Sequence, residues 1–118
     1  MIGTLIMTLF HARTTAHVLH LKTHSFAAHK ALNEFYDGIV DLADSLAEAY
    51  QGCYGIIDSY PAKYTPYANA LDMLAELREC IDECAKKSWK PEDTHLNNLC
   101  DEIRTLIAST QYKIKNLK

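Results

Sequence analysis

The chain has 118 residues, of which 48% are hydrophobic and 23% charged, and its formal net charge at pH 7 is −3. This length can bury one hydrophobic core but not two, so we expect a single domain over residues 1–118. The slightly acidic balance argues against sequence-independent binding of nucleic acid, because such binding needs a basic surface that displaces counterions from phosphates.

Apolar residues recur at three- and four-residue spacing in four segments. This period predicts an all-α protein with helices over about residues 2–22, 26–51, 66–87 and 92–116. The chain has only four glycines and three prolines, which favours long uninterrupted helices. Four amphipathic helices in one domain are typical of a four-helix bundle.

The first ten residues, MIGTLIMTLF, are apolar enough to resemble a targeting segment. We interpret them as the start of the first helix, because they lack a charged leading region and a small-residue cleavage site. His11 and Arg13 also interrupt the apolar run far short of a membrane span. We therefore expect a cytoplasmic protein that does not enter a membrane.

Five of the six histidines lie between residues 11 and 29. Around the first predicted helix, His20 falls on or near the apolar stripe, His17 lies to one side and His11 faces away. His20 is therefore a candidate inward ligand, with His17 and His24 as candidate neighbours. We expect His11 to be solvated.

The second predicted helix carries two adjacent lines of residues. Its apolar line, the expected core face, consists of Leu32, Phe35, Tyr36, Ile39, Leu42, Ala43, Leu46 and Tyr50. Beside this line, steps of three and four residues join His29, Asn33, Asp37, Val40, Asp44 and Glu48. At about 100° per residue these six residues stay within roughly a quarter turn, so they can face one partner surface. Histidine and oxygen ligands beside a buried seam are the components of an iron site in a helical bundle.

This pattern resembles the mini-ferritins, the Dps proteins of the ferritin-like superfamily that protect DNA in starved bacteria. In that family, a histidine ending the first helix and a second-helix run His-x3-Asp-x10-Asp-x3-Glu form a ferroxidase centre across a two-fold dimer interface. His29, Asp44 and Glu48 fall on the second-helix positions with this spacing. We assign His20 to the first-helix position, while Asn33 stands where the family has an aspartate.

The resemblance covers roughly Thr14 to Gly52, and the rest of the chain agrees in helical pattern only. The stretch from His20 to His29 is shorter than in the usual members. The whole chain is also shorter than most members and lacks their basic tail. It is similar to trimmed relatives of the kind that bacteriophages carry.

The resemblance implies a ferritin-like four-helix bundle with a crossover loop between the second and third helices. The implied metal ligands are His20, His29, Asn33, Asp44 and Glu48. Asp37 is a second candidate for the place of Asn33. Ferrous iron would be oxidised by peroxide or oxygen and stored as ferric mineral in a shell of twelve subunits. Because the site is shared across a dimer interface, a homodimer is the minimum assembly. The ligand chemistry by itself also allows zinc or manganese.

Residues 53–66, CYGIIDSYPAKYTP, are the stretch richest in glycine and proline. A dozen extended residues can reach roughly 40 Å, which is enough to pass along a bundle of such helices.

We expect the second helix to end near Gln51-Gly52, with Gly52 supplying the left-handed exit. Ser25 is the predicted cap at its other end. The third helix is expected to begin at Thr65-Pro66, as a cap followed by a first-turn proline.

Two smaller patterns leave alternatives open. Glu92 and His95 have the Glu-x-x-His spacing that di-iron bundles use twice, but the chain has one copy, which disfavours a di-iron centre within one subunit. Cys80 and Cys84 lie one helical turn apart. They either share a soft metal ion or are free thiols beside a packed face, and we favour free thiols.

A second function also remains open. The chain could be a ferritin-like bundle without ferroxidase chemistry that acts as a small interaction or inhibitor protein. Asn33, the shortened first loop and the missing basic tail favour this alternative. The two functions differ in one requirement, because iron oxidation needs the histidine and carboxylate ligands to converge across a two-fold axis.

Overall fold

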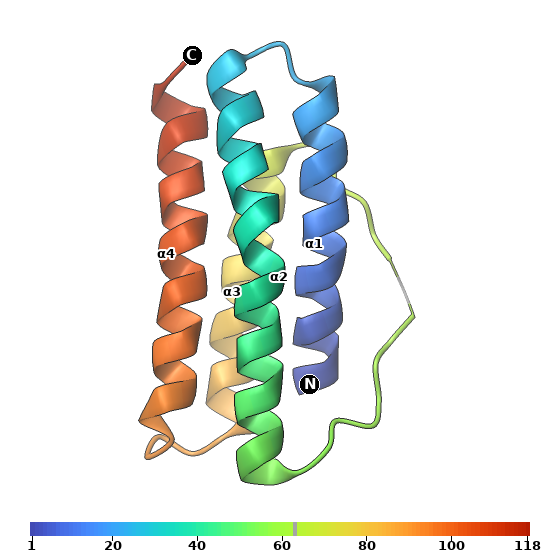
Figure 1. Cartoon of the computed structure of the whole chain (residues 1–118), viewed down its shortest axis with the longest axis vertical. Coiled ribbons are helices and arrows are strands. Elements are labelled where there is room, and N and C mark those ends of the chain that lie inside the picture. The colour runs from blue at the N-terminus through green and yellow to red at the C-terminus, as the bar shows by residue number, and fades with distance from the viewer. Residues whose placement is uncertain (63) are drawn as a thin grey trace.

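The computed structural model describes residues 1–62 and 64–118. It contains the helices α1 (Ile2–Lys22), α2 (Phe26–Tyr54), α3 (Ala70–Ser88) and α4 (Thr94–Asn116). Figure 1 shows these helices side by side, aligned with the long axis of the molecule. The described residues form no strand, so the predicted all-α class is confirmed. None of the helices in this part of the chain has the length and apolar character that crossing a membrane requires.

Each helix packs against two others. α1 contacts α2 and α3, and α4 also contacts α2 and α3, so α1 lies diagonal to α4 and α2 lies diagonal to α3. In Figure 1 the chain rises along α1, descends along α2 and again along α3, and rises along α4. Neighbouring helices are therefore antiparallel, whereas the diagonal helices α2 and α3 run in the same direction.

The apolar stripes of all four helices meet in one core. Side chains with no solvent exposure include Leu5, Leu9, Phe35, Ile39, Leu74, Ile81, Leu96 and Ile103. Burying one such side chain stabilises a fold by about 1.5–3 kcal/mol relative to leaving it exposed. The core face predicted for the second helix is confirmed, and α1 has the predicted bounds.

The end of α2 differs from the prediction. The helix continues through Gly52 to Tyr54, and Gly55 adopts the positive φ of 95° that ends it. The Gly55 N–H donates to the Gln51 carbonyl at 2.9 Å. A glycine inside a helix costs about 1 kcal/mol relative to alanine. The last turn of α2 is nevertheless held, because the Tyr54 hydroxyl donates a hydrogen bond to the Asp93 carboxylate at the start of α4.

The starts of α3 and α4 also lie later than predicted. α3 begins at Ala70, because the Asn69 side chain accepts hydrogen bonds from two backbone N–H groups in the first turn, at 2.8 and 3.2 Å. An asparagine cap with two bonds outweighs the Thr65-Pro66 signal. α4 begins at Thr94 rather than residue 92, because residues 90–93 form a hydrogen-bonded turn.

Residues 55–69 connect α2 to α3. Since these helices run in the same direction, the connection returns along the length of the molecule, and its described parts lie beside α1 in Figure 1. The Tyr64 hydroxyl lies 2.5 Å from the Thr15 hydroxyl of α1. A Cβ atom on Gly3 would lie only 1.9 Å from the Ser59 carbonyl oxygen. The missing side chain at Gly3 is therefore what lets the connection lie directly against α1.

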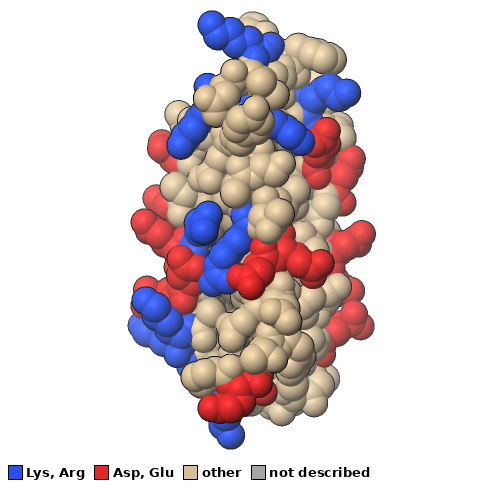
Figure 2. All heavy atoms as spheres, turned by 90° about the vertical axis from the view of Figure 1, so that its left-hand side faces the viewer, with Lys and Arg blue, Asp and Glu red and all other residues tan. Residues whose placement is uncertain are grey.

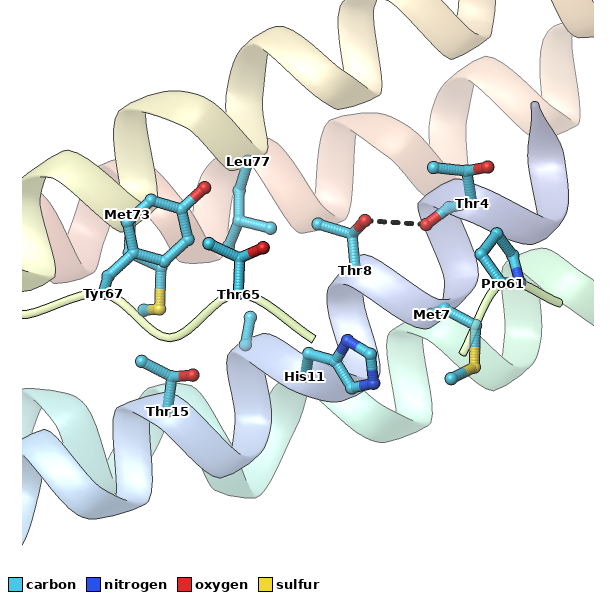
Figure 3. Close-up of a pocket in the computed structure, with 11 residues that line it drawn as sticks. Thr4, Met7, Thr8, His11, Thr15, Pro61, Thr65, Tyr67, Met73 and Leu77 are labelled. Atoms are coloured by element: carbon cyan, nitrogen blue, oxygen red, sulfur yellow. Dashed lines mark hydrogen bonds between the residues drawn. The ribbon is translucent and has the colours of Figure 1, made fainter. Parts of the chain in front are cut away.

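A cavity of about 270 Å³ lies between α1, this connection and α3, and threonine and methionine side chains line much of it (Figure 3). His11 also lines it and packs edge-on against Tyr64, with ring centroids 4.7 Å apart. We expected His11 to be solvated, but it is half-buried. The prediction was wrong because helical position alone does not reveal which face of α1 the connection covers.

Candidate metal centre

The candidate ligands His20 and His29 lie on either side of the short turn between α1 and α2. Ser25, the predicted cap, accepts a hydrogen bond from the Ala28 N–H at 3.2 Å and starts α2 immediately after the turn. The last turn of α1 consequently lies beside the first turn of α2. His20 is buried, with 7% of its surface exposed, and His29 is half-buried.

The two imidazoles make a reciprocal contact. The His20 Nδ1 lies 2.7 Å from the His29 carbonyl oxygen, and the His29 Nδ1 lies 2.8 Å from the His20 carbonyl oxygen. Their rings stack with centroids 3.6 Å apart and planes at 19°. Two side chains and two backbone groups thus join the end of α1 to the start of α2.

This contact determines which ring nitrogen carries the proton. A carbonyl oxygen only accepts, so Nδ1 must be the donor in both neutral rings, and each Nε2 keeps its lone pair. Among the described residues, no buried side-chain nitrogen or oxygen lacks a hydrogen-bond partner. The two Nε2 atoms make no hydrogen bond within the described residues, so their lone pairs are not engaged by another side chain or backbone group there. Metal-binding histidines use the same arrangement, with Nδ1 donating to a carbonyl or carboxylate and Nε2 facing the ion.

The stacking limits how one ion can use both rings. Each Nε2 lone pair lies in the plane of its ring, and the planes are nearly parallel. Lone pairs that lie in parallel planes do not meet at one point. If one ion is to be bound by both Nε2 atoms at about 2.1 Å, the rings must tilt apart. The observed arrangement therefore does not aim both lone pairs at one point.

Aromatic and polar side chains extend the histidine pair along α2. His17 stacks on Tyr36 with centroids 4.2 Å apart, and the Tyr36 ring meets the His20 ring edge-on at 5.3 Å. The Tyr36 hydroxyl donates to the Asn33 Oδ1 at 2.7 Å, and the Asn33 Nδ2 donates to the Asp37 Oδ2 at 2.8 Å. The amide oxygen of Asn33 retains one further lone pair for a ligand.

Tyr36 is a member of this cluster that the sequence analysis missed. We assigned it to the apolar face, where its ring does pack. Its hydroxyl, however, lies on the polar side and contacts Asn33, three residues earlier. The signal was present, because residues three apart on a helix are neighbours and a partly buried tyrosine hydroxyl usually finds a partner.

Asp44 and Glu48 lie far from the histidines within one chain. Both are exposed on α2, and at 1.5 Å per residue they are about 22 and 28 Å along the helix from His29. Consistently, no group of three or more histidine, cysteine, aspartate or glutamate side chains in residues 1–62 and 64–118 is placed to hold a metal ion. The five predicted ligands are not assembled by a single copy of the chain.

The two smaller patterns have structural explanations. Cys84 is buried and Cys80 is half-buried against the core, which confirms their predicted position beside a packed face. Burial raises the pKa of both thiols. His95 of the Glu-x-x-His pattern lies against α2, with its Nε2 3.3 Å from the Cys53 sulfur.

Acidic and basic side chains are interspersed over the face shown in Figure 2. On α4, Arg104 pairs with Asp82 at 2.7 Å and with Asp101 at 2.9 Å. Lys113 pairs with Glu34 of α2 at 2.6 Å, and this contact lowers the pKa of the Glu34 carboxyl. Two basic groups of α4 are thus paired with carboxylates.

The described residues form an all-α, four-helix protein in which the His20–His29 contact joins the first two helices. The chain belongs to a family of unknown function, DUF5856, whose model matches residues 20–114. This match begins at His20 and includes every candidate ligand. No curated protein and no solved structure matches the chain.

Proposed function

We propose that this protein binds and oxidises ferrous iron at sites shared between two copies of the chain, as a mini-ferritin-like protein. The observation that carries the proposal is the reciprocal contact of His20 and His29, which leaves a lone pair on both Nε2 atoms. Carboxylates occupy the other half of the same helix, at Asp44 and Glu48. Imidazole and carboxylate together suit iron, while zinc and manganese are the alternatives.

The proposed fold is the ferritin-like bundle with a crossover connection. Such bundles differ from simple up-and-down bundles by one long connection between their second and third helices. The parallel course of α2 and α3, and the connection that runs beside α1, support this assignment.

A second copy would supply the carboxylates. If two α2 helices pack antiparallel about an axis near Gly38, His29 of each copy comes opposite the segment Asp44–Glu48 of the other. This pairing brings Lys30 of one copy opposite the acidic segment of the other, whereas the Asp37 residues of the two copies meet near the axis. A dimer is the smallest assembly that completes the site, and the resemblance to mini-ferritins implies a shell of twelve subunits.

In this site, iron would supply the redox chemistry and the protein would control its position and exposure to solvent. His20 and His29 would be the nitrogen ligands, and Asp44 and Glu48 the oxygen ligands. Asn33 would contribute a neutral oxygen in place of a carboxylate, which weakens the attraction for a hard cation. The free thiols fit a reducing compartment, so the proposed location is the cytoplasm.

The test compares ferrous iron binding and oxidation by the purified protein and by a His29→Ala, Asp44→Ala double variant. Glu79→Gln serves as the control, because it removes an exposed carboxylate from α3 without touching α2. Oligomer mass and helix content are measured on the same samples. We expect the parent and the control to oxidise iron and the double variant to lose this activity with its mass unchanged. A parent protein that neither binds nor oxidises iron would contradict the proposal.

One observation favours the alternative function as an interaction protein. Three apolar side chains are exposed around the turn between α1 and α2: Val18 at 43%, Leu21 at 71% and Phe26 at 71%. Exposed apolar side chains gathered at one end of a molecule mark an interaction site. If the parent protein does not handle iron, this apolar end becomes the surface on which to seek a protein partner.

A further inference from the structure

The end of α2 and the start of α4 bring a cysteine and a histidine together. The Cys53 sulfur lies 3.3 Å from the His95 Nε2, and both residues are exposed. Cys53 is 24 residues from His29, or about 36 Å along α2, so this pair is separate from the candidate metal centre. The two residues come from helices that meet only in the folded chain.

Neighbouring side chains hold these two helix ends together independently of the pair. The Tyr54 hydroxyl donates to the Asp93 carboxylate and accepts a hydrogen bond from the Lys90 N–H at 3.2 Å. Tyr50 stacks on Tyr54 with centroids 5.0 Å apart and also packs edge-on against Trp89 at 6.4 Å. Because Tyr54 follows Cys53 directly, these contacts position the thiol beside α4.

A cysteine beside a histidine base is the arrangement that makes a thiol nucleophilic. The reactive form of cysteine is the thiolate, and an unassisted thiol is only a few per cent ionised at neutral pH. A base within hydrogen-bond distance takes the proton as the sulfur attacks. His95 also lies in the first turn of α4, where unpaired backbone N–H groups carry partial positive charge.

The other three cysteines have the opposite surroundings. Cys84 and Cys100 are fully buried, and Cys80 is half-buried. Burial raises the pKa of all three thiols, and that of Cys100 rises to about 11. Cys84 and Cys100 are shielded from reagents in solution, and all three thiols resist ionisation, whereas Cys53 combines exposure with an adjacent base.

We propose that Cys53 and His95 form a reactive thiol site that exchanges with low-molecular-weight disulfides. His95 accepts the Cys53 proton, and the sulfur attacks one sulfur of the small disulfide. One sulfur–sulfur bond forms between Cys53 and that fragment while the disulfide's own bond breaks. The departing thiolate takes up the proton, so the products are a mixed disulfide on Cys53 and one free small thiol.

The test uses an aromatic disulfide that releases a coloured thiol on exchange, applied to the folded protein at neutral pH. The parent should show one fast-reacting thiol per chain, and Cys53→Ser should abolish that phase. His95→Gln should slow this phase by roughly tenfold. An unassisted thiol is a few per cent ionised, so complete ionisation can raise the exchange rate by at most ~30-fold. His24→Gln is the matched control, since it removes an exposed histidine from the turn between α1 and α2, at the other end of α2 from Cys53.

Mass spectrometry after brief treatment with an aliphatic disulfide should locate the adduct on Cys53. Two results would overturn the proposal: a fast phase that survives Cys53→Ser, or equal rates in the parent and His95→Gln. Helix content is measured for each variant, and Cys53→Ala provides a second substitution should the serine variant lose structure. Iron oxidation has no part in these measurements, so their outcome is independent of the proposed function.

Discussion

His20 and His29 each donate their Nδ1 proton to the backbone carbonyl oxygen of the other, at 2.7 and 2.8 Å, while their rings stack. This mutual contact joins two helices and at the same time leaves both Nε2 atoms with a lone pair. A structural role and a ligand role are therefore compatible in the same two side chains.

The reciprocal contact should contribute measurably to stability. Replacing His29 with alanine removes the Nδ1 donor that bonds the His20 carbonyl oxygen, and it removes the ring that stacks on His20. We expect the free energy of unfolding to fall by about 1–3 kcal/mol, from about 0.5–1.5 for the hydrogen bond and a similar amount for the ring pair. Urea unfolding checks this value, and the exposed His24→Ala should change stability by less than about 0.5 kcal/mol.

The same contact predicts the protonation pattern of the two rings. In mildly alkaline solution, nitrogen NMR should show protonated Nδ1 and unprotonated Nε2 atoms for both His20 and His29. Ferrous iron or zinc should then shift the Nε2 resonances first. The opposite tautomer in either ring would mean that the carbonyl contacts do not exist in solution.

Gly3 and Gly52 should respond in opposite directions to alanine. Both lie in helices, where alanine is intrinsically favoured by about 1 kcal/mol. A Cβ on Gly52 meets nothing within 4 Å, whereas one on Gly3 would lie 1.9 Å from the Ser59 carbonyl oxygen. We expect Gly52→Ala to stabilise the protein and Gly3→Ala to destabilise it by about 1–3 kcal/mol, since overpacking displaces backbone. Equal gains in both variants, measured by urea unfolding, would show that the connection does not rest on α1.

Charge reversal tests the proposed antiparallel pairing of α2. In this pairing, Lys30 of one copy lies opposite Asp44 of the other. Lys30→Glu and Asp44→Lys should each raise the dissociation constant of the dimer by roughly tenfold, because the dimer contains this ion pair twice and each pair contributes up to about 1 kcal/mol. The double swap should restore the attraction. Sedimentation at low ionic strength measures the effect, and single variants that associate as well as the double variant would rule out this register.

Alkaline pH should destabilise the protein through Cys100. The pKa of this thiol rises from 9.0 to about 11 because the folded protein buries it. As pH rises from about 9 to about 11, the unfolded chain loses this proton while the folded chain keeps it, so the free energy of unfolding falls. Below about pH 9 the contribution of Cys100 is constant. Cys100→Ala should lower the baseline stability but flatten its decline over this interval, and parallel pH profiles for the two proteins would contradict the assignment.

Sequence reasoning recovered the parts of the structure that depend on local pattern. The four helices, the core faces and the Ser25 cap all follow from spacing and side-chain type over a few residues. It failed at the ends of α2 and α3. Whether Gly52 or Gly55 stops α2 depends on contacts such as that of Tyr54 with Asp93. The start of α3 was a choice between two local cap signals, and Asn69 rather than Thr65 caps the helix.

The candidate site divides in the same way. The amino-acid sequence by itself determined the lines of residues along each helix, because side chains at helical spacing share a face whatever surrounds them. It thereby selected His20 and His29. Only the tertiary structure decided that each histidine bonds the carbonyl of the other, that His95 meets Cys53, and that the connection lies on Gly3. These relationships join backbone and side-chain atoms of separate segments, and packing of the whole chain sets the distances between them.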